Sequence, residues 1–443
     1  MTLRVRVRSY ARLLTLTVLV FALLAPIVPS SAFGSGSSST TSAHAAKAHH
    51  KKKCRKKHKC KKKHRRKKCK RYRKVRVKRH GKRVTVKRCV RKHKKKSTNA
   101  PDANTAPGAN IIQRGPLQFG LNAMWNTDSD VQRAVAAGVT LSRMEVSWNR
   151  VEPQAGKWDW SDYDYTYRTN ARNGMTILPV LISAPSWAES SWNKVPSDPT
   201  AYSQYVAAVV ARYGPGGTYW KQNPSVPYHP SVYFEVWNEP YWTNFAAGGS
   251  NPAQYARLFR AAAIAGRAAN PQARFLLETD LTGYATPSNQ VEWIDAMYAA
   301  APDLNIWADG IAVHPYSQPR PPDAYEPSNN RWAFRRLLDI HNKLIAHGAG
   351  DKPFWITEVG YPTCPSDPSK CVSESQQASY LQREFEIIKT EYASFIQTVF
   401  IYKYRDPDSG QNPSDMEDWF GLFRPNMTPK PAWDVLRRAT GAI

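Results

Sequence analysis

The sequence predicts an α/β protein, a (β/α)8 TIM barrel preceded by a signal peptide and a disordered polybasic segment. Short apolar runs alternate with amphipathic stretches of helical period over residues 111–443, which is the pattern of repeated βα units. Eight such runs occur, and eight parallel strands close a barrel. A doubly wound open sheet is the alternative. It is disfavoured because no glycine-rich phosphate-binding turn follows the first run.

The eight predicted strands are rich in β-branched and aromatic residues. They are LQFGLNA (117–123), VTLSRMEV (139–146), MTILPVL (175–181), VYFEVWN (232–238), ARFLLET (273–279), GIAVH (310–314), PFWITE (353–358) and FIQTVFIYKY (395–404). Helix-like segments lie between them, among others at residues 199–214, 251–270 and 373–392. Several begin with Ser, Asn or Pro and end with Gly or Asn, as helix capping requires.

Residues 1–110 lack this alternation. Residues 1–32 combine a basic start, an apolar run and small residues, which predicts a secretory signal peptide, with an uncleaved anchor as the alternative. The apolar run is short for a membrane span, so we expect no stable span and an extracellular or cell-envelope location. Residues 33–46 and 97–110 are predicted linkers on either side of a Lys/Arg-rich low-complexity segment, residues 47–96.

The net charge of +30 comes from the N-terminal region. Residues 47–96 hold 31 of the 64 Lys and Arg residues and no Asp or Glu, whereas residues 97–443 hold 29 Lys and Arg against 34 Asp and Glu. A like-charge run of this density stays extended and solvated. Within it, residues 71–90 alternate Val with Lys or Arg around a His-Gly turn, which predicts a two-stranded hairpin.

The polybasic segment, residues 47–96, indicates an anionic partner. An anionic cell-wall polymer or an acidic polysaccharide would be held by charge, and a solvated tail without a specific partner is the alternative. We expect no nucleic-acid partner, because export is predicted and stacking aromatic residues are nearly absent from the segment, which has only Tyr72.

Six cysteines fit an oxidising compartment. Cys364 and Cys371 bracket a short loop with Pro and Ser residues, and a disulfide would close it. The other four lie among lysines and histidines without forming paired C-x-x-C units, so we favour disulfides or loosely paired thiols over a metal site. These four are Cys54, Cys60, Cys69 and Cys89.

Polar side chains gather where the predicted strands end. In a (β/α)8 barrel these carboxyl ends form one mouth, which is the face that carries catalytic residues. Two glutamates, after strands four and seven, would face each other across the mouth. That arrangement suits hydrolysis of a glycosidic bond, in which one carboxyl protonates the leaving oxygen and the other attacks the anomeric carbon. The polar side chains at these strand ends are Arg143, Asn238, Glu239, His314, Tyr316 and Glu358.

The motifs around these residues resemble glycoside hydrolase clan A, whose retaining barrel enzymes place Asn-Glu-Pro at strand four and Glu at strand seven. The resemblance covers residues 117–438. Glu239 and Glu358 are 119 residues apart, a separation that is more similar to that of family 39 than to that of family 5, which is the alternative family. The motifs are SRMEVSW, WNRVEPQAGKWDWSDYD, LISAPSWA, WNEP, HPY, WITEVGYP and GLFRPNMTPKPAWDVL.

The resemblance implies a role for each matching residue. Glu239 would be the general acid/base and Glu358 the nucleophile. Asn238 would bond the sugar 2-hydroxyl. Arg143 and Tyr316 would hold Glu358 ionised, because a cation and a hydroxyl donor both favour the carboxylate. Nearby apolar surface and a negative neighbour would keep Glu239 protonated.

Further residues would line the same site. The resemblance places His314 beside the acid/base. It also implies that flat aromatic faces meet sugar rings, and it implies no metal and no organic cofactor. The aromatic residues are Trp148 and Trp187, together with Trp125, Trp242 and Tyr361.

Two features depart from the clan pattern. The clan commonly has Trp at the end of strand eight, where this chain has Tyr402, Lys403 and Tyr404. Some clan members also have a His after strand three, which this chain lacks.

Taken together, the motifs predict that residues 111–443 form the catalytic domain of a secreted retaining glycosidase. It would act on β-linked oligo- or polysaccharides. A catalytically silent carbohydrate-binding barrel and a transglycosylase are the alternatives.

Overall fold

The computed structural model describes seven stretches of the chain. The predicted signal peptide, both linkers and most of the Lys/Arg-rich segment lie outside them, as do Cys54, Cys60, Cys69 and Trp125. By its contacts the chain divides into two units, Met1–Ala109 and Asn110–Ile443. The described residues are 72–79, 82–89, 115–124, 126–280, 292–325, 333–408 and 410–443.

The first unit contains the predicted hairpin. Strands β1 (Tyr72–Arg79) and β2 (Lys82–Cys89) pair antiparallel along their whole length. The register places Val75 opposite Val86, and β-branched residues in directly opposite positions favour strand pairing. The alternation of Val with basic residues therefore gave the correct prediction for this part of residues 47–96.

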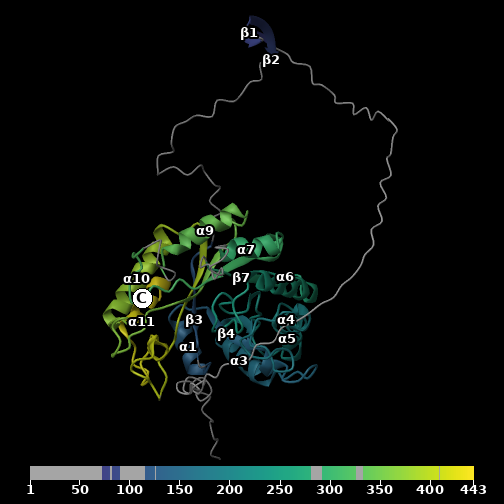
Figure 1. Ribbon diagram of the computed structural model, residues 1–443. Coiled ribbons are helices and arrows are strands. Elements are labelled where there is room, and N and C mark those ends of the chain that lie inside the picture. The colour runs from purple at the N-terminus through teal and green to yellow at the C-terminus, as the bar shows by residue number, and fades with distance from the viewer. Residues whose placement is uncertain are drawn as a thin grey trace, which may run out of the picture. The chain divides into compact units, whose positions relative to one another are not determined.

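The second unit is a closed barrel of eight parallel strands (Figure 1). The strand order around the barrel is β10-β3-β4-β5-β6-β7-β8-β9. Each strand overlaps one of the eight predicted apolar runs, so the (β/α)8 prediction is confirmed and the open sheet is excluded. The strands are β3 (Gln118–Asn122), β4 (Leu141–Ser147), β5 (Thr176–Ile182), β6 (Tyr233–Val236), β7 (Arg274–Glu278), β8 (Gly310–Val313), β9 (Phe354–Val359) and β10 (Ile396–Ile401).

Helices surround the barrel, with α4 beside α6 and α10 beside α11 (Figure 1). The three helical segments named from the sequence are α4, α6 and α10. Their starts are capped as expected: Asn251 accepts from the Gln254 amide, and Ser373 forms a capping box with Gln376. None of the helices in the described residues is long and apolar enough to cross a membrane. The helices are α1 (Asp128–Ala136), α2 (Trp148–Val151), α3 (Ser161–Arg172), α4 (Pro199–Tyr213), α5 (Thr218–Gln222), α6 (Pro252–Ala269), α7 (Trp293–Ala300), α8 (Leu304–Trp307), α9 (Arg336–Ala346), α10 (Glu374–Thr390), the 3-10 turn η1 (Met416–Trp419) and α11 (Pro431–Thr440).

The barrel contains a small apolar layer of its own, separate from the larger core between strands and helices. Phe400 is fully buried in this layer. A Cβ atom at Gly120 would lie 2.2 Å from the Phe400 ring, which explains the glycine in the middle of β3. This layer fills the barrel below the mouth. It consists of Leu178, Leu276, Ala312, Trp355 and Phe400.

The loop that follows β9 is closed by the predicted disulfide. Cys364 and Cys371 are bonded, and both residues are buried. Their separation of seven residues makes a short covalent loop between the end of β9 and the start of α10. The disulfide therefore constrains the chain directly after the strand that carries Glu358.

Candidate active site

The backbone turns sharply where β6 reaches the barrel mouth. Trp237 and Glu239 have φ values of 69° and 41°, a left-handed conformation that is unusual for residues with a side chain. Trp237 is fully buried, and its indole nitrogen donates to the carbonyl of Phe245 at 2.7 Å. This anchor holds the turn that points Asn238 and Glu239 into the mouth. Strained backbone of this kind concentrates at functional sites.

Glu239 and Glu358 face each other from β6 and β9, with His314 beside both. One oxygen of each carboxyl and a nitrogen of His314 all lie within 4.8 Å of one another. His314 Nδ1 lies 2.9 Å from Glu239 Oε1 and 3.7 Å from Glu358 Oε2. The structure therefore brings together the two glutamates that the sequence placed 119 residues apart.

Arg143 organises the floor of the mouth. Its Nη1 donates to Glu358 Oε1 at 2.5 Å, and its Nη2 donates to Asn238 Oδ1 at 2.8 Å. The same guanidinium is held from below by Glu235, with Nε–Oε2 at 2.7 Å and Nη2–Oε1 at 3.1 Å. Asn122, at the end of β3, accepts from Nη1 at 3.1 Å. Arg143 thus fixes the nucleophile candidate and the amide of Asn238 relative to each other.

Tyr316 donates a hydrogen bond to the other oxygen of Glu358. Its Oη lies 2.7 Å from Oε2, so each oxygen of this carboxylate has one donor, since Arg143 contacts Oε1. The Tyr316 ring packs edge-on against Tyr402 and Phe420, with centroids 6.2 and 5.7 Å away. Tyr402 therefore supports Tyr316 at the end of β10, the position where the clan pattern has Trp.

The electrostatics differ between the two glutamates. Burial raises the pKa of Glu239 above its ordinary value, and the negative charge of Glu358 adds to this effect, while His314 opposes it. The side chain of Glu239 is 5 % exposed, whereas that of Glu358 is 13 % exposed. Glu239 therefore favours the protonated form that a general acid needs.

The surroundings of His314 favour its charged form. Burial opposes ionisation, but the surrounding carboxylates, Glu358 and Glu278 foremost, raise the pKa of His314 well above its ordinary value. With both ring nitrogens protonated, Nδ1 donates to Glu239 and Nε2 to Thr357 Oγ1 at 3.1 Å. Thr357 Oγ1 in turn donates to Glu235 at 3.0 Å. The imidazole is thereby fixed at both ends.

Two carboxylates of this cluster, Glu235 and Glu278, were not predicted as site residues from the sequence. Glu235 interrupts the otherwise apolar strand β6, and Glu278 is the last residue of β7. Both side chains point into the barrel, toward Arg143 and His314, and a carboxylate within or at the end of an apolar run was the available signal. Both are fully buried. The charge of Arg143 lowers the pKa of Glu235 although burial opposes this, whereas burial raises the pKa of Glu278 well above its ordinary value. Glu278 Oε1 accepts from Tyr241 at 3.3 Å, and within the described residues Oε2 has no hydrogen-bond partner.

Among the residues that the structure describes, two triads of side chains have the spacing of metal ligands. They are Glu235, Glu278 and His314, and Glu239, His314 and Glu358. Both triads share His314, whose surroundings favour the imidazolium form, in which neither nitrogen has a free lone pair. Arg143 also pairs directly with Glu235 and Glu358. A cation in either place would have to displace an existing cation from its carboxylates, so the donor set fits proton chemistry better than metal binding.

The aromatic residues predicted to contact sugar fall into two groups. Trp148 is 1 % exposed, stacks on Tyr205 and donates its indole N–H to Glu152, so it is a packing residue, in contrast to the expected sugar contact. Tyr361 is fully buried as well. Trp187 is 37 % exposed, with its edge fixed by a hydrogen bond to the Glu152 carbonyl.

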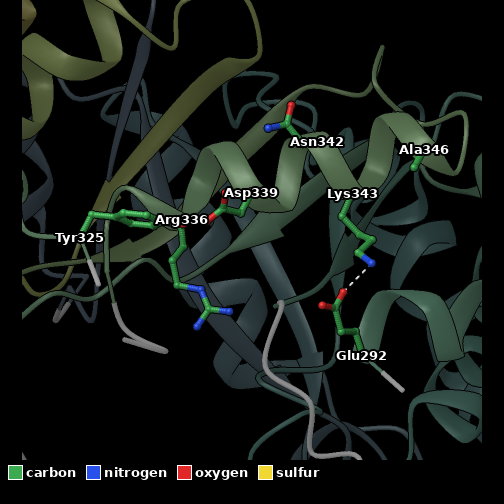
Figure 2. Close-up of a pocket in the computed structure, with 7 residues that line it drawn as sticks. All are labelled: Glu292, Tyr325, Arg336, Asp339, Asn342, Lys343 and Ala346. Atoms are coloured by element: carbon green, nitrogen blue, oxygen red, sulfur yellow. Dashed lines mark hydrogen bonds and ion pairs between the residues drawn. The ribbon is translucent and has the colours of Figure 1, made fainter. Parts of the chain in front are cut away.

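A surface hollow of about 460 Å³ lies along α9 (Figure 2). Figure 2 shows Lys343 reaching across it to Glu292, at 2.6 Å. Lys343 also pairs with Asp295, and Tyr325 donates to Asp339. Its charged groups are thus largely satisfied by one another, and none of its lining residues belongs to the carboxylate cluster.

Comparison with solved structures identifies barrels of the expected clan. A family 39 glycoside hydrolase from the gut symbiont Bacteroides cellulosilyticus WH2 matches with a TM-score of 0.55 and 19 % identity, over 81 % of this chain and 67 % of that one. The GH39 enzyme from Xanthomonas axonopodis pv. citri matches with a TM-score of 0.53 and 18 % identity, over 74 % and 67 %. A monomeric beta-xylosidase from Caulobacter crescentus CB15 gives 0.53 and 19 %, over 74 % and 69 %.

These likenesses show that the chain shares the (β/α)8 fold of glycosidases of this clan. Comparison with protein-family models and with curated protein sequences gives no match. The fold and the arrangement of Glu239, Glu358 and His314 are therefore the grounds on which a function can be argued.

Proposed function

We propose that this protein is a secreted retaining glycoside hydrolase that cleaves β-linked O-glycosidic bonds. The observation that carries the proposal is the pair Glu239 and Glu358, whose nearest carboxyl oxygens lie within 4.8 Å. Retaining enzymes hold their two carboxyls about 5–5.5 Å apart, whereas inverting enzymes leave a gap of about 6.5–9.5 Å for a water molecule. The similarity of fold to family 39 glycosidases supports the same reading.

In the first step, Glu358 attacks the anomeric carbon and forms a glycosyl ester. Glu239 gives its proton to the glycosidic oxygen as the bond to that oxygen breaks, and the leaving sugar departs as an alcohol. Arg143 and Tyr316 each hold one oxygen of Glu358, which fixes the direction of attack. Asn238 is oriented by Arg143 through its amide oxygen, which leaves its N–H₂ group to donate to the sugar 2-hydroxyl.

In the second step, Glu239 acts as a base. It takes a proton from water, the water oxygen attacks the anomeric carbon, and Glu358 leaves as a carboxylate. His314 stabilises the carboxylate of Glu239 at this stage through the 2.9 Å contact. Two overall inversions give net retention. A sugar hydroxyl in place of water would give transglycosylation, which is one alternative, and a barrel that binds glycans without turnover is the other.

An assay on the full chain tests the proposal. The wild type and Glu358→Ala are incubated with a panel of 4-nitrophenyl β-glycosides and β-linked polysaccharides, and aglycone or reducing-end release is followed. We expect release by the wild type and none by the variant. Equal release by both would contradict the assignment. Glycan binding by the wild type without release would favour the silent barrel, and elongated products would favour the transglycosylase.

We further propose that the protein is exported and that residues 47–96 bind an anionic cell-wall polymer. Support comes from the density of charge, 31 basic residues and no acidic one. Binding by charge releases counterions and therefore weakens steeply as salt rises. Co-sedimentation of the full chain with purified cell walls, at low and high salt, tests this. Retention that does not respond to salt, or that survives deletion of residues 47–96, would contradict it.

A further inference from the structure

The exposed tryptophans are not spread evenly over the barrel. Three tryptophans in the described residues have more than a third of their surface exposed: Trp158, Trp187 and Trp192. Trp187 and Trp192 lie in the loop between β5 and α4, and such loops open onto the barrel mouth, whereas Trp158, in the segment after β4, stacks on Trp160. Exposed tryptophan is uncommon away from binding surfaces, since its large apolar face gains most from burial. This clustering marks one side of the mouth.

The loop that carries Trp192 is fastened to the loop that carries Glu239. The Trp192 carbonyl accepts from the Ala184 amide at 2.8 Å, which closes the loop after β5 on itself. The next residue, Asn193, bridges to the loop after β6 through the amide of Ala247 at 3.1 Å and the carbonyl of Asn244 at 2.8 Å. Trp192 is therefore held by backbone contacts, although 45 % of it is exposed.

A series of aromatic rings connects Glu239 to Trp192. The amide of Trp242 donates to the carbonyl of Glu239 at 2.8 Å, so Trp242 lies one turn after the acid. The Trp242 ring contacts Phe245, with centroids 6.0 Å apart, and Phe245 contacts Trp192, with centroids 6.2 Å apart. Both contacts are edge-to-face, and 45 % of Trp192 remains exposed and accessible to a ligand.

The position of these aromatic rings relative to the two glutamates indicates which part of a substrate would contact them. In the proposed mechanism Glu239 protonates the oxygen of the leaving group, so the leaving group lies on the side of Glu239. Trp242 follows Glu239 by one turn, and the ring contacts continue from it through Phe245 to the exposed Trp192. Pyranose rings present polarised C–H groups, and these favour the electron-rich face of an aromatic ring.

We propose that Trp192, with Phe245 and Trp242, forms a platform that stacks on sugar rings of the leaving group. This rests on the proposed function and narrows its substrate class. The natural substrate is an oligo- or polysaccharide with sugar units on both sides of the cleaved bond. A glycoside with a small non-sugar leaving group would not reach Trp192.

Steady-state kinetics of Trp192→Ala in the full chain tests the platform. The probes are 4-nitrophenyl β-D-xylopyranoside and β-1,4-xylotetraose, with the matching glucose and mannose pairs in parallel. We expect KM for the tetrasaccharide to rise about tenfold, since a lost stacking contact is worth that much. KM for the aryl glycoside should stay within about twofold, as for an ordinary surface substitution. Trp192→Phe should recover part of the loss.

A matched control is Ile306→Ala, which removes an exposed apolar side chain from α8, ahead of β8, and should change neither substrate. An equal loss on both substrates would show a structural role for Trp192 and overturn the platform. Unchanged KM for the tetrasaccharide would overturn it as well. A wild type that cleaves aryl glycosides but no oligosaccharide would refute the platform alone. A wild type that cleaves neither refutes the proposed function, and the platform falls with it.

Discussion

Arg143 and Glu235 form a two-pronged ion pair inside the barrel, directly below the mouth. Nε–Oε2 is 2.7 Å and Nη2–Oε1 is 3.1 Å, and the side chains are 6 % and 0 % exposed. A bidentate pair of this kind fixes the plane of the guanidinium. Because the plane is fixed, Nη1 points at Glu358 and Nη2 at Asn238. Glu235, which lies below the mouth, thus positions two residues of the candidate site through Arg143.

Removing Arg143 should destabilise the barrel strongly. The variant Arg143→Met leaves Glu235 ionisable, buried and without its bidentate partner, which costs about 3–5 kcal/mol in free energy of unfolding. The double variant Arg143→Met with Glu235→Leu removes the unpaired charge and should regain much of that loss. Urea unfolding of the wild type, the single variant and the double variant measures both effects. A double variant no more stable than the single one would show that the ion pair is not the reason for the loss.

Replacement of the nucleophile should be rescued by a small anion. Glu358→Ala should lower kcat/KM for an aryl β-glycoside by about 1,000-fold or more, because no glycosyl ester forms. Azide occupies the space left by the carboxylate and should restore turnover with a product of inverted configuration. The product's configuration is read by NMR. Glu386→Ala, on the exposed face of α10, is the control and should keep wild-type rates.

Replacement of the acid should depend on the leaving group. Glu239→Ala should retain the first step on a dinitrophenyl glycoside, whose leaving group needs no proton, and lose it on an alkyl glycoside. In the wild type, kcat/KM should fall as pH rises through the raised pKa of Glu239, since the acid then loses its proton. The variant should lack this alkaline fall. An unchanged pH profile would assign the acid to another group.

Glu278→Gln should change how stability depends on pH. The pKa of Glu278 lies well above 4.5 in the folded protein, so folding at neutral pH takes up a proton there, and the wild type loses stability as pH rises above that ordinary value. Gln does not ionise. The free energy of unfolding of the variant, relative to that of the wild type, should therefore rise by about 1.4 kcal/mol per pH unit until the pKa of Glu278 in the folded protein is reached. Urea unfolding of both proteins across this range measures the gain, and a pH-independent difference would contradict it.

The eight strands were predictable because each is a compact apolar run, and such runs are local features of the chain. Glu239 and Glu358 were predictable for a similar reason, since each stands at a strand end within a recognisable motif. Glu235 was missed because its role depends on Arg143, 92 residues earlier. A charged residue inside an apolar strand is destabilising if it stays unpaired and useful if it forms an ion pair, and only the distant partner decides which applies.

Trp148 shows the same limit from the other direction. Its position after β4 suggested an open aromatic face. The structure places it against Tyr205 of α4, which lies 57 residues later in the chain, with ring centroids 5.6 Å apart. Trp187 packs edge-on against it as well. Residues within a few positions of Trp148 gave no sign of this burial. Long-range packing therefore decides which of the loop tryptophans are exposed.

The place of His314 between two carboxyls has a consequence for the proposed reaction cycle. Before attack, the positive charges of Arg143 and His314 balance the carboxylates of Glu235 and Glu358. In the glycosyl ester Glu358 is neutral and Glu239 has become the carboxylate, so the sum of charges is the same. The negative charge moves between two oxygens that lie 3.7 and 2.9 Å from one fixed imidazolium nitrogen. Neither half of the cycle would then create net charge in a region that water reaches poorly, and little dielectric rearrangement would accompany each step.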